Sequence, residues 1–142
     1  MRVILDVNVW ISALLWGGVP AKTLRLARNQ QINVFVSELL LLELETTLKR
    51  DKFQLRLQQR SYTVEDLMSV VQGLSNDYPT ISVDAPQLRD PKDTVVLAAA
   101  VAANAEAIIT GDLDLLVLIE FNKIPILTPQ DFLSRYFPDS KL

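Results

Sequence analysis

The sequence predicts a three-layer α/β/α sandwich with a central parallel sheet of four to five strands. Short runs rich in β-branched residues alternate with longer helical runs along the whole chain. Strands that are separated by helices pair in parallel, with the helices covering both faces of the sheet. The 142 residues, 49% of them hydrophobic, contain neither a repeat nor a linker. We therefore expect one domain over residues 1–142 with a core of its own.

The first half of the chain contains two strands, predicted over Arg2–Leu5 and Asn33–Val36 because these runs are apolar and β-branched. Thr63, followed three residues later by Asp66, is typical of a helix N-terminus. Helices are expected over 9–15, from Pro20 to about 30, from the candidate N-cap Ser37 to about 49, over 53–60, and from Thr63 to about 74.

The second half continues the alternation. Pro91 suits the first turn of a helix to Asn104, and the apolar stretch 95–103 within it should be buried on all sides. Strands are expected over 80–83, 107–110 and 124–127, and further helices over 113–120 and 129–136.

Composition narrows the chemistry. The chain has no cysteine and no histidine, which excludes disulfides, thiolate nucleophiles, Ser-His triads and Cys- or His-ligated zinc. Any metal site must be lined by oxygen atoms, which suits Mg²⁺ or Mn²⁺. Asp6 interrupts the N-terminal apolar run, so no signal peptide is expected, and the longest apolar stretch, 95–103, is too short to span a membrane. We expect a cytoplasmic protein with no membrane contact.

Charge is unevenly distributed. The net charge of −3 argues against a general nucleic-acid binder. Residues 49–60, "KRDKFQLRLQQR", nevertheless hold five basic residues and one acid, with Lys52, Arg56 and Arg60 on one helix face. This face is either simply solvated or guides a nucleic-acid backbone. Trp10 and Trp16 are expected in the core or an interface, with base stacking as the alternative.

Acidic residues recur where predicted strands end and helices begin. Asp6 follows the first strand directly, and Asp112 follows the strand 107–110. The carboxyl ends of parallel strands meet at one edge of the sheet, where ligands bind. Singly, each of these acids is better explained as a helix cap. Glu43 is not, because it lies within a helix between two leucines, although a helical wheel does not separate it from Glu45.

Several acids at one sheet edge would repel each other, and each would raise the pKa of its neighbours unless a counter-charge were present. A divalent cation supplies that charge. Mg²⁺ prefers carboxylates together with water and phosphate oxygens, and it assists phosphodiester hydrolysis without cysteine or histidine. The sequence therefore favours a metal-dependent phosphodiesterase.

Four segments carry a family resemblance: "VILDVNVWIS", "SELLLLELETTLKR", "RDPKDTVVLAAAVAANAEAIITGDLDLL" and "IPILTPQDFL". Together they resemble a PIN domain (PilT N-terminus), and more narrowly the VapC-like toxin components of bacterial toxin–antitoxin systems. The resemblance covers nearly the whole chain. It implies an α/β/α fold and an Mg²⁺- or Mn²⁺-dependent endoribonuclease that cleaves single-stranded or structured RNA. It also implies a cognate antitoxin protein as partner and a homodimer.

The resemblance assigns residues. The catalytic and metal-ligating acids are implied to be Asp6, Glu43, Asp93 and Asp112. Accessory positions are Asn8, Ser12, Asp90, Thr110 and Asp114, and Asp90 and Asp93 are open to an exchange of roles. Water would attack the phosphodiester in line, with Glu43 as a ligand through water or as the group that orients the attacking water. Candidates for contacting the RNA backbone are Lys49, Arg50, Lys52 and Arg56.

Two other classes compete. Receiver-like signalling domains are also α/β proteins that bind Mg²⁺, but they need an acidic pair after the first strand and a lysine at a late strand end, and here Asp6 stands alone. A haloacid-dehalogenase-type phosphatase needs an aspartate where this chain has Asn8, and no Gly-rich phosphate loop is present. A non-catalytic protein-binding domain whose acids cap helices remains the main alternative.

Overall fold

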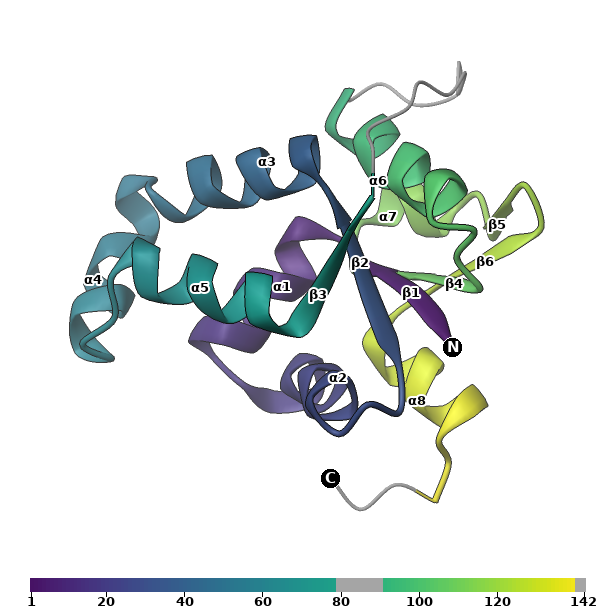
Figure 1. Cartoon of the computed structure of the whole chain (residues 1–142), viewed down its shortest axis with the longest axis horizontal. Helices are drawn as coiled ribbons and strands as arrows, with labels where there is room; N and C mark the ends of the chain where they lie inside the picture. The colour runs from purple at the N-terminus through teal and green to yellow at the C-terminus, as the bar shows by residue number, and fades with distance from the viewer. Residues whose placement is uncertain (79–90, 140–142) are drawn as a thin grey trace.

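The computed structural model describes residues 1–78 and 91–139 (Figure 1). Its strands are β1 (Arg2–Leu5), β2 (Asn33–Ser37), β3 (Ser75–Tyr78), β4 (Ala107–Ile109), β5 (Glu120–Phe121) and β6 (Ile124–Leu127). Its helices are α1 (Val7–Leu15), α2 (Gly18–Arg28), α3 (Glu38–Leu48), α4 (Asp51–Gln59), α5 (Val64–Leu74), α6 (Pro91–Ala102), α7 (Leu113–Leu116) and α8 (Pro129–Tyr136).

The sheet confirms the predicted fold class. Its strand order is β3-β2-β1-β4-β6-β5, with every pair parallel except β5 and β6. From β1 the chain first proceeds outward to β2 and β3, and then returns past β1 to β4 and β6. The direction of winding therefore changes between β1 and β4, and in such sheets the crevice beyond the carboxyl ends at this point is the usual ligand site.

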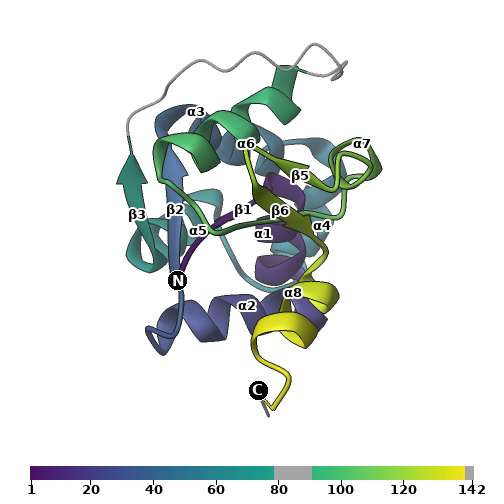
Figure 2. The same cartoon turned by 90° about the vertical axis from the view of Figure 1, so that its right-hand side faces the viewer.

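Helices lie on both sides of the sheet (Figure 2). Helix α6 packs on β1, β2 and β4, whereas on the opposite side α2 packs against both α1 and α8. The side chains of Val3, Ile4 and Leu5 in β1 are wholly buried between these layers. None of the described helices has the length and apolar character that a membrane span requires.

Local signals in the sequence fix several helix ends. The Ser37 hydroxyl accepts a hydrogen bond from the Leu40 amide, as expected of an N-cap. Thr63 and Asp66 form a reciprocal capping box: the Thr63 amide donates to Asp66 Oδ2 and the Asp66 amide donates to the Thr63 hydroxyl, both at 3.0 Å. Hydrogen bonds from the Thr63 backbone and side chain lower the pKa of the exposed Asp66 carboxyl. The interpretation of this segment as a helix start is confirmed.

One predicted element needs correction. The helix expected over 113–120 ends at Leu116, because the chain turns and forms β5 instead. Asn122 and Lys123 both have positive φ, at 49° and 66°, which closes a two-residue hairpin between β5 and β6. The strand expected over 80–83 lies outside the described residues, and the third described strand is β3, which no sequence signal indicated.

Helix α3 permits a matched test of the packing. Leu44 is 1% exposed, whereas Leu42, two residues away on the same helix, is 60% exposed. We expect Leu44→Ala to lower the free energy of unfolding by about 2–5 kcal/mol, because it leaves a cavity in the core. Leu42→Ala should change it by about 0.5 kcal/mol or less. Urea denaturation measures both, and equal losses would contradict the described orientation of α3.

Candidate active site

Asp6 lies where β1 ends and α1 begins. Its amide donates to the Ile109 carbonyl (2.9 Å), which continues the pairing of β1 with β4 by one residue. Its Oδ1 accepts from the Val7 amide (2.7 Å), and its Oδ2 accepts from the Thr110 hydroxyl (2.7 Å). The side chain is only 7% exposed. Asp6 is thus a helix cap, as one interpretation of the sequence held, and also a buried carboxylate fixed at the switch point of the sheet.

Thr110 connects the two strand ends. Its hydroxyl donates to Asp6 and also accepts from the Asp112 amide (3.0 Å). Its own amide donates to the Leu127 carbonyl (2.9 Å), which ties the end of β4 to β6. Thr110 is fully buried. One hydroxyl therefore sets the position of the carboxylate after β1 relative to the loop after β4.

Three aspartates meet beside this loop. One carboxylate oxygen each from Asp93, Asp112 and Asp114 lies within 4.8 Å of the other two. Asp93 comes from the first turn of α6 and is 5% exposed. Asp112 caps α7, since its Oδ1 accepts from the Asp114 amide (2.8 Å). Asp114, which was predicted as an accessory position, belongs to this cluster.

Glu43 reaches the same region from α3. A polar pocket of about 240 Å³ is lined by Asp6, Glu43, Asp93 and Asp112, so four separate segments of the chain each contribute one acid. Glu45 turns to the surface, where it forms an ion pair with Lys49 (3.2 Å). The structure thus separates the two glutamates that a helical wheel did not.

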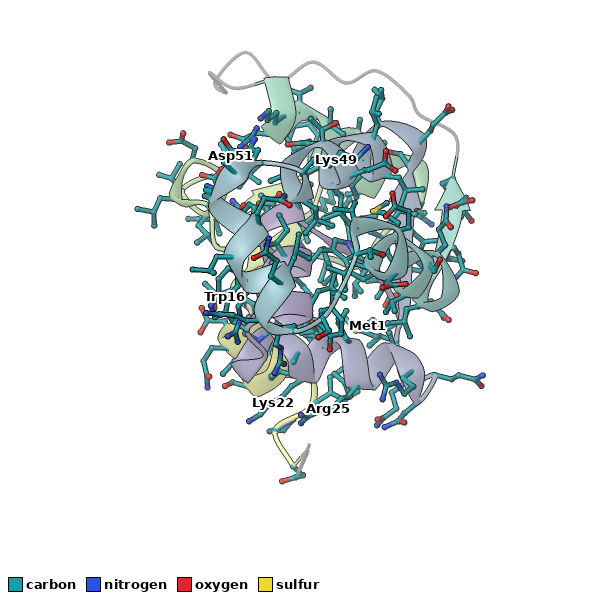
Figure 3. All side chains as sticks on the ribbon, turned by 90° about the vertical axis from the view of Figure 1, so that its left-hand side faces the viewer. Met1, Trp16, Lys22, Arg25, Lys49 and Asp51 are labelled. Carbon is teal, nitrogen blue, oxygen red and sulfur yellow. The ribbon has the colours of Figure 1, made fainter. Side chains whose placement is uncertain are left out.

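Cationic side chains line the pocket together with the acids. They come from the start of α4 and its preceding residue, and from the first turn of α6: Arg50, Lys52 and Lys92. The other two basic residues singled out in the sequence lie elsewhere. Lys49 pairs with Glu45, and Arg56 donates from Nε to the Leu15 carbonyl (2.8 Å). Figure 3 shows Lys49 and Asp51 at the α3–α4 corner.

Some of the remaining predicted residues line the pocket and others do not. Asn8 lines the pocket, whereas Ser12 lies one turn further along α1 and outside the lining. Asp90 falls outside the described residues. The sequence analysis missed Thr47 and Lys92, both of which line the pocket. Lys92 is the immediate neighbour of Asp93 in "RDPKD", and this adjacency was the one available signal.

The donor set fits a hard divalent cation. Every candidate ligand is a carboxylate oxygen, which is the ligand type that Mg²⁺ and Mn²⁺ prefer. Two oxygens on opposite sides of Mg²⁺ lie about 4.2 Å apart, given bonds of about 2.1 Å. The oxygen separations within the cluster of Asp93, Asp112 and Asp114, all 4.8 Å or less, are compatible with this span. An ion would also offset the cost of holding nearby carboxylates partly out of water.

Comparison with known proteins identifies a family and a shared fold. A family model described as PIN domain matches residues 2–114. The fold is similar to the crystal structure of VapBC2 from Rickettsia felis bound to a DNA fragment from their promoter, with a TM-score of 0.60 and 14% sequence identity. That likeness covers 89% of this chain and 97% of the other, and at this identity it establishes the fold alone. No curated protein matches the chain.

Thr110 permits an isosteric test. Thr110→Val removes the hydroxyl that serves both Asp6 and the Asp112 amide but keeps the side-chain shape. We expect it to lower the free energy of unfolding by about 1–3 kcal/mol, because a buried carboxylate loses a donor and a backbone amide loses an acceptor. Thr110→Ser keeps the hydroxyl, so its free energy of unfolding should fall clearly less. Denaturant unfolding of both variants measures this, and equal stabilities would contradict the bridging role.

Proposed function

Since the chain belongs to the PIN domain family, we propose that it is an Mg²⁺- or Mn²⁺-dependent endoribonuclease that hydrolyses phosphodiester bonds of RNA. The observation that carries this proposal is the pocket in which acids from four segments meet cations from the start of α4 and from α6. Carboxylates suit a divalent cation, and arginine and lysine suit a phosphate backbone. The choice of RNA as substrate rests on the resemblance to PIN-domain ribonucleases.

The metal site would consist of Asp6, Asp93 and Asp112, with Asp114 as a further ligand and Glu43 as a ligand through water. When bound, Mg²⁺ would neutralise negative charge that builds on the phosphodiester oxygens during hydrolysis. These carboxylates would bind one or two metal ions. Thr110 would hold Asp6 in register for this task through its hydroxyl.

The chain's own residues would perform the other steps. Arg50, Lys52 and Lys92 would bind phosphate oxygens and hold the backbone across the pocket. The Glu43 carboxylate would orient the attacking water and accept its proton. The water oxygen bonds to phosphorus, and the bond from phosphorus to the leaving oxygen breaks. Asn8, at the pocket wall, would donate a hydrogen bond to substrate.

The biological setting proposed here is that of a toxin. The fold is similar to one in the structure of VapBC2, which is bound to a DNA fragment from their promoter. We propose by analogy a cytoplasmic toxin component that acts as a homodimer and is controlled by a cognate antitoxin protein. The alternative is a non-catalytic domain that binds a protein partner. It is favoured by the fact that Asp6 and Asp112 each accept a backbone amide at the start of a helix.

A metal-binding experiment distinguishes the metal-dependent nuclease from the non-catalytic domain and needs no substrate. We expect Mg²⁺ or Mn²⁺ to raise the thermal midpoint of unfolding, with a stabilisation of about 2.7 kcal/mol at a hundred times the dissociation constant. Asp93→Asn and Asp112→Asn should remove most of this increment. Glu65→Gln, an exposed acid in the first turn of α5, should retain it. Differential scanning fluorimetry measures all four proteins, and an increment unchanged in both aspartate variants would place the ion elsewhere.

Cleavage of labelled single-stranded RNA tests the activity itself. The wild type should cut in Mg²⁺ or Mn²⁺ and stop in EDTA. Asp6→Asn and Asp93→Asn should each reduce the rate by about 10²- to 10³-fold, the loss typical of removing one group that stabilises charge in the transition state. Glu65→Gln serves as the matched control. Folded wild-type protein that cuts neither this RNA nor structured RNA in any metal would favour the non-catalytic alternative.

A further inference from the structure

The two tryptophans of the chain have different environments. Trp10 is fully buried in the core, whereas Trp16, at the end of α1, is 52% exposed. Exposure of one large apolar side chain is ordinary by itself. Here, however, it coincides with the basic segment 49–60, which packs beside it through Phe53 and Arg56. Figure 3 shows Trp16 beside α4, on the face that also carries Lys49 and Asp51.

The backbone around Trp16 is built to hold this side chain. Gly17 and Gly18 both have positive φ, at 79° and 65°, and Gly17 has ψ at −131°, a combination that residues with a Cβ rarely adopt. Arg56 donates from Nε to the Leu15 carbonyl, which satisfies one of the unpaired carbonyls at the end of α1. The same guanidinium lies over the Trp16 ring, 5.5 Å from its centroid. Arg56 thus contacts both the end of α1 and the indole ring that follows it.

A continuous row of side chains leads from this indole to the acidic pocket. The Trp16 and Phe53 ring centroids are 6.0 Å apart in an edge-to-face arrangement. Lys52 lies over the other ring, with Nζ 5.0 Å from the Phe53 centroid, and Lys52 also lines the pocket that holds the acids. The row therefore consists of two adjacent aromatic rings with a cation at each end, Arg56 over Trp16 and Lys52 over Phe53.

Helix α1 sets the distance between the two ends of this row. Asp6 directly precedes the helix and Trp16 directly follows it, so the separation of these two residues along the helix axis is about 15 Å at 1.5 Å per residue. Single-stranded nucleic acids are bound by aromatic rings that stack bases and by cations that follow the backbone. A base seated on Trp16 would lie a few nucleotides from the phosphate in the pocket.

We propose that Trp16, held by Arg56, is a base-stacking subsite for the single-stranded RNA that is cut at the acidic pocket, with Lys52 binding an intervening phosphate. This inference rests on the proposed nuclease function. A nucleic acid is favoured over a protein partner because four more basic than acidic side chains lie in residues 49–60 of a chain whose net charge is −3. Stacking on an indole tolerates any base, so the subsite would position RNA rather than read its sequence.

Binding without cleavage tests the subsite. In an Asp93→Asn background, a fluorescein-labelled polyuridine oligonucleotide of about a dozen nucleotides serves as the probe, a length within the usual site sizes for single strands. We expect Trp16→Ala to weaken binding by about 5- to 100-fold, the range for losing one stacked base. Trp16→Tyr, which keeps an aromatic face, should recover most of the affinity. Tyr136→Ala, which removes the aromatic half of the separate Arg135–Tyr136 pair, is the matched control and should bind as its parent does.

A second readout distinguishes stacking from a general effect on folding. One nucleotide of the probe is replaced at a time by an abasic one. At one position, the abasic probe should bind the parent protein as weakly as the full probe binds Trp16→Ala. When the abasic probe and Trp16→Ala are combined, the loss of binding free energy should be no larger than for either change alone. In a Trp10→Phe protein, the remaining Trp16 emission should be quenched by the probe. Equal binding by parent and Trp16→Ala, or additive effects at every position, would overturn the subsite.

The outcomes separate the two proposals. If Trp16→Ala cleaves RNA as efficiently as the wild type, the subsite is overturned and the proposed nuclease function stands. Absence of metal-dependent cleavage would overturn the nuclease, whatever the fluorescence shows. Another outcome is that sedimentation shows Trp16→Ala to dissociate a dimer while binding of the probe is unchanged. This face then forms the interface with a second copy of the chain, and the subsite is likewise overturned.

Discussion

The parallel pairing of β1 with β4, closed by the hydrogen bond from Thr110 to Asp6, is the interaction on which the site depends. The sheet changes its direction of winding here, so the ends of both strands open into the same crevice. The Thr110 hydroxyl then fixes Asp6 and the Asp112 amide at once. Without this contact the acids would still follow their strands in the sequence, but nothing would set the position of the Asp6 carboxylate relative to the loop that holds Asp112.

The electrostatics of the pocket follow from that arrangement. Asp6 and Asp93 are both nearly buried, and burying carboxylates costs several kcal/mol each unless opposite charge or hydrogen bonds compensate. Part of the compensation comes from the chain, through backbone amides and through cations such as Lys92 that line the same walls. A divalent cation at the carboxylate cluster would supply the rest. The same mixture of acids and cations that stabilises the pocket also suits it to a phosphodiester.

Sequence reasoning succeeded where a local rule determines structure. Alternating apolar runs gave the sheet, and the capping signal at Thr63 gave the start of α5. It failed where long-range contacts decide. The hairpin turn at Asn122–Lys123 lacks the usual glycine, so β5 was mistaken for the end of a helix. Likewise, no periodicity could separate Glu43 from Glu45, because the distinction depends on which face of α3 meets α6 and the pocket.

If acids from distant segments form one metal centre, crystals soaked in Mn²⁺ should reveal the ion by anomalous scattering. We expect a peak bonded to carboxylate oxygens of Asp93 and Asp112, beside Asp6 and Thr110, at about 2.0–2.3 Å, the range for hard divalent cations with oxygen ligands. Saturating Mn²⁺ that leaves this pocket without a peak, or that gives one only at another surface, would show that these acids form no metal centre. The acids would then be caps of the helices that follow them.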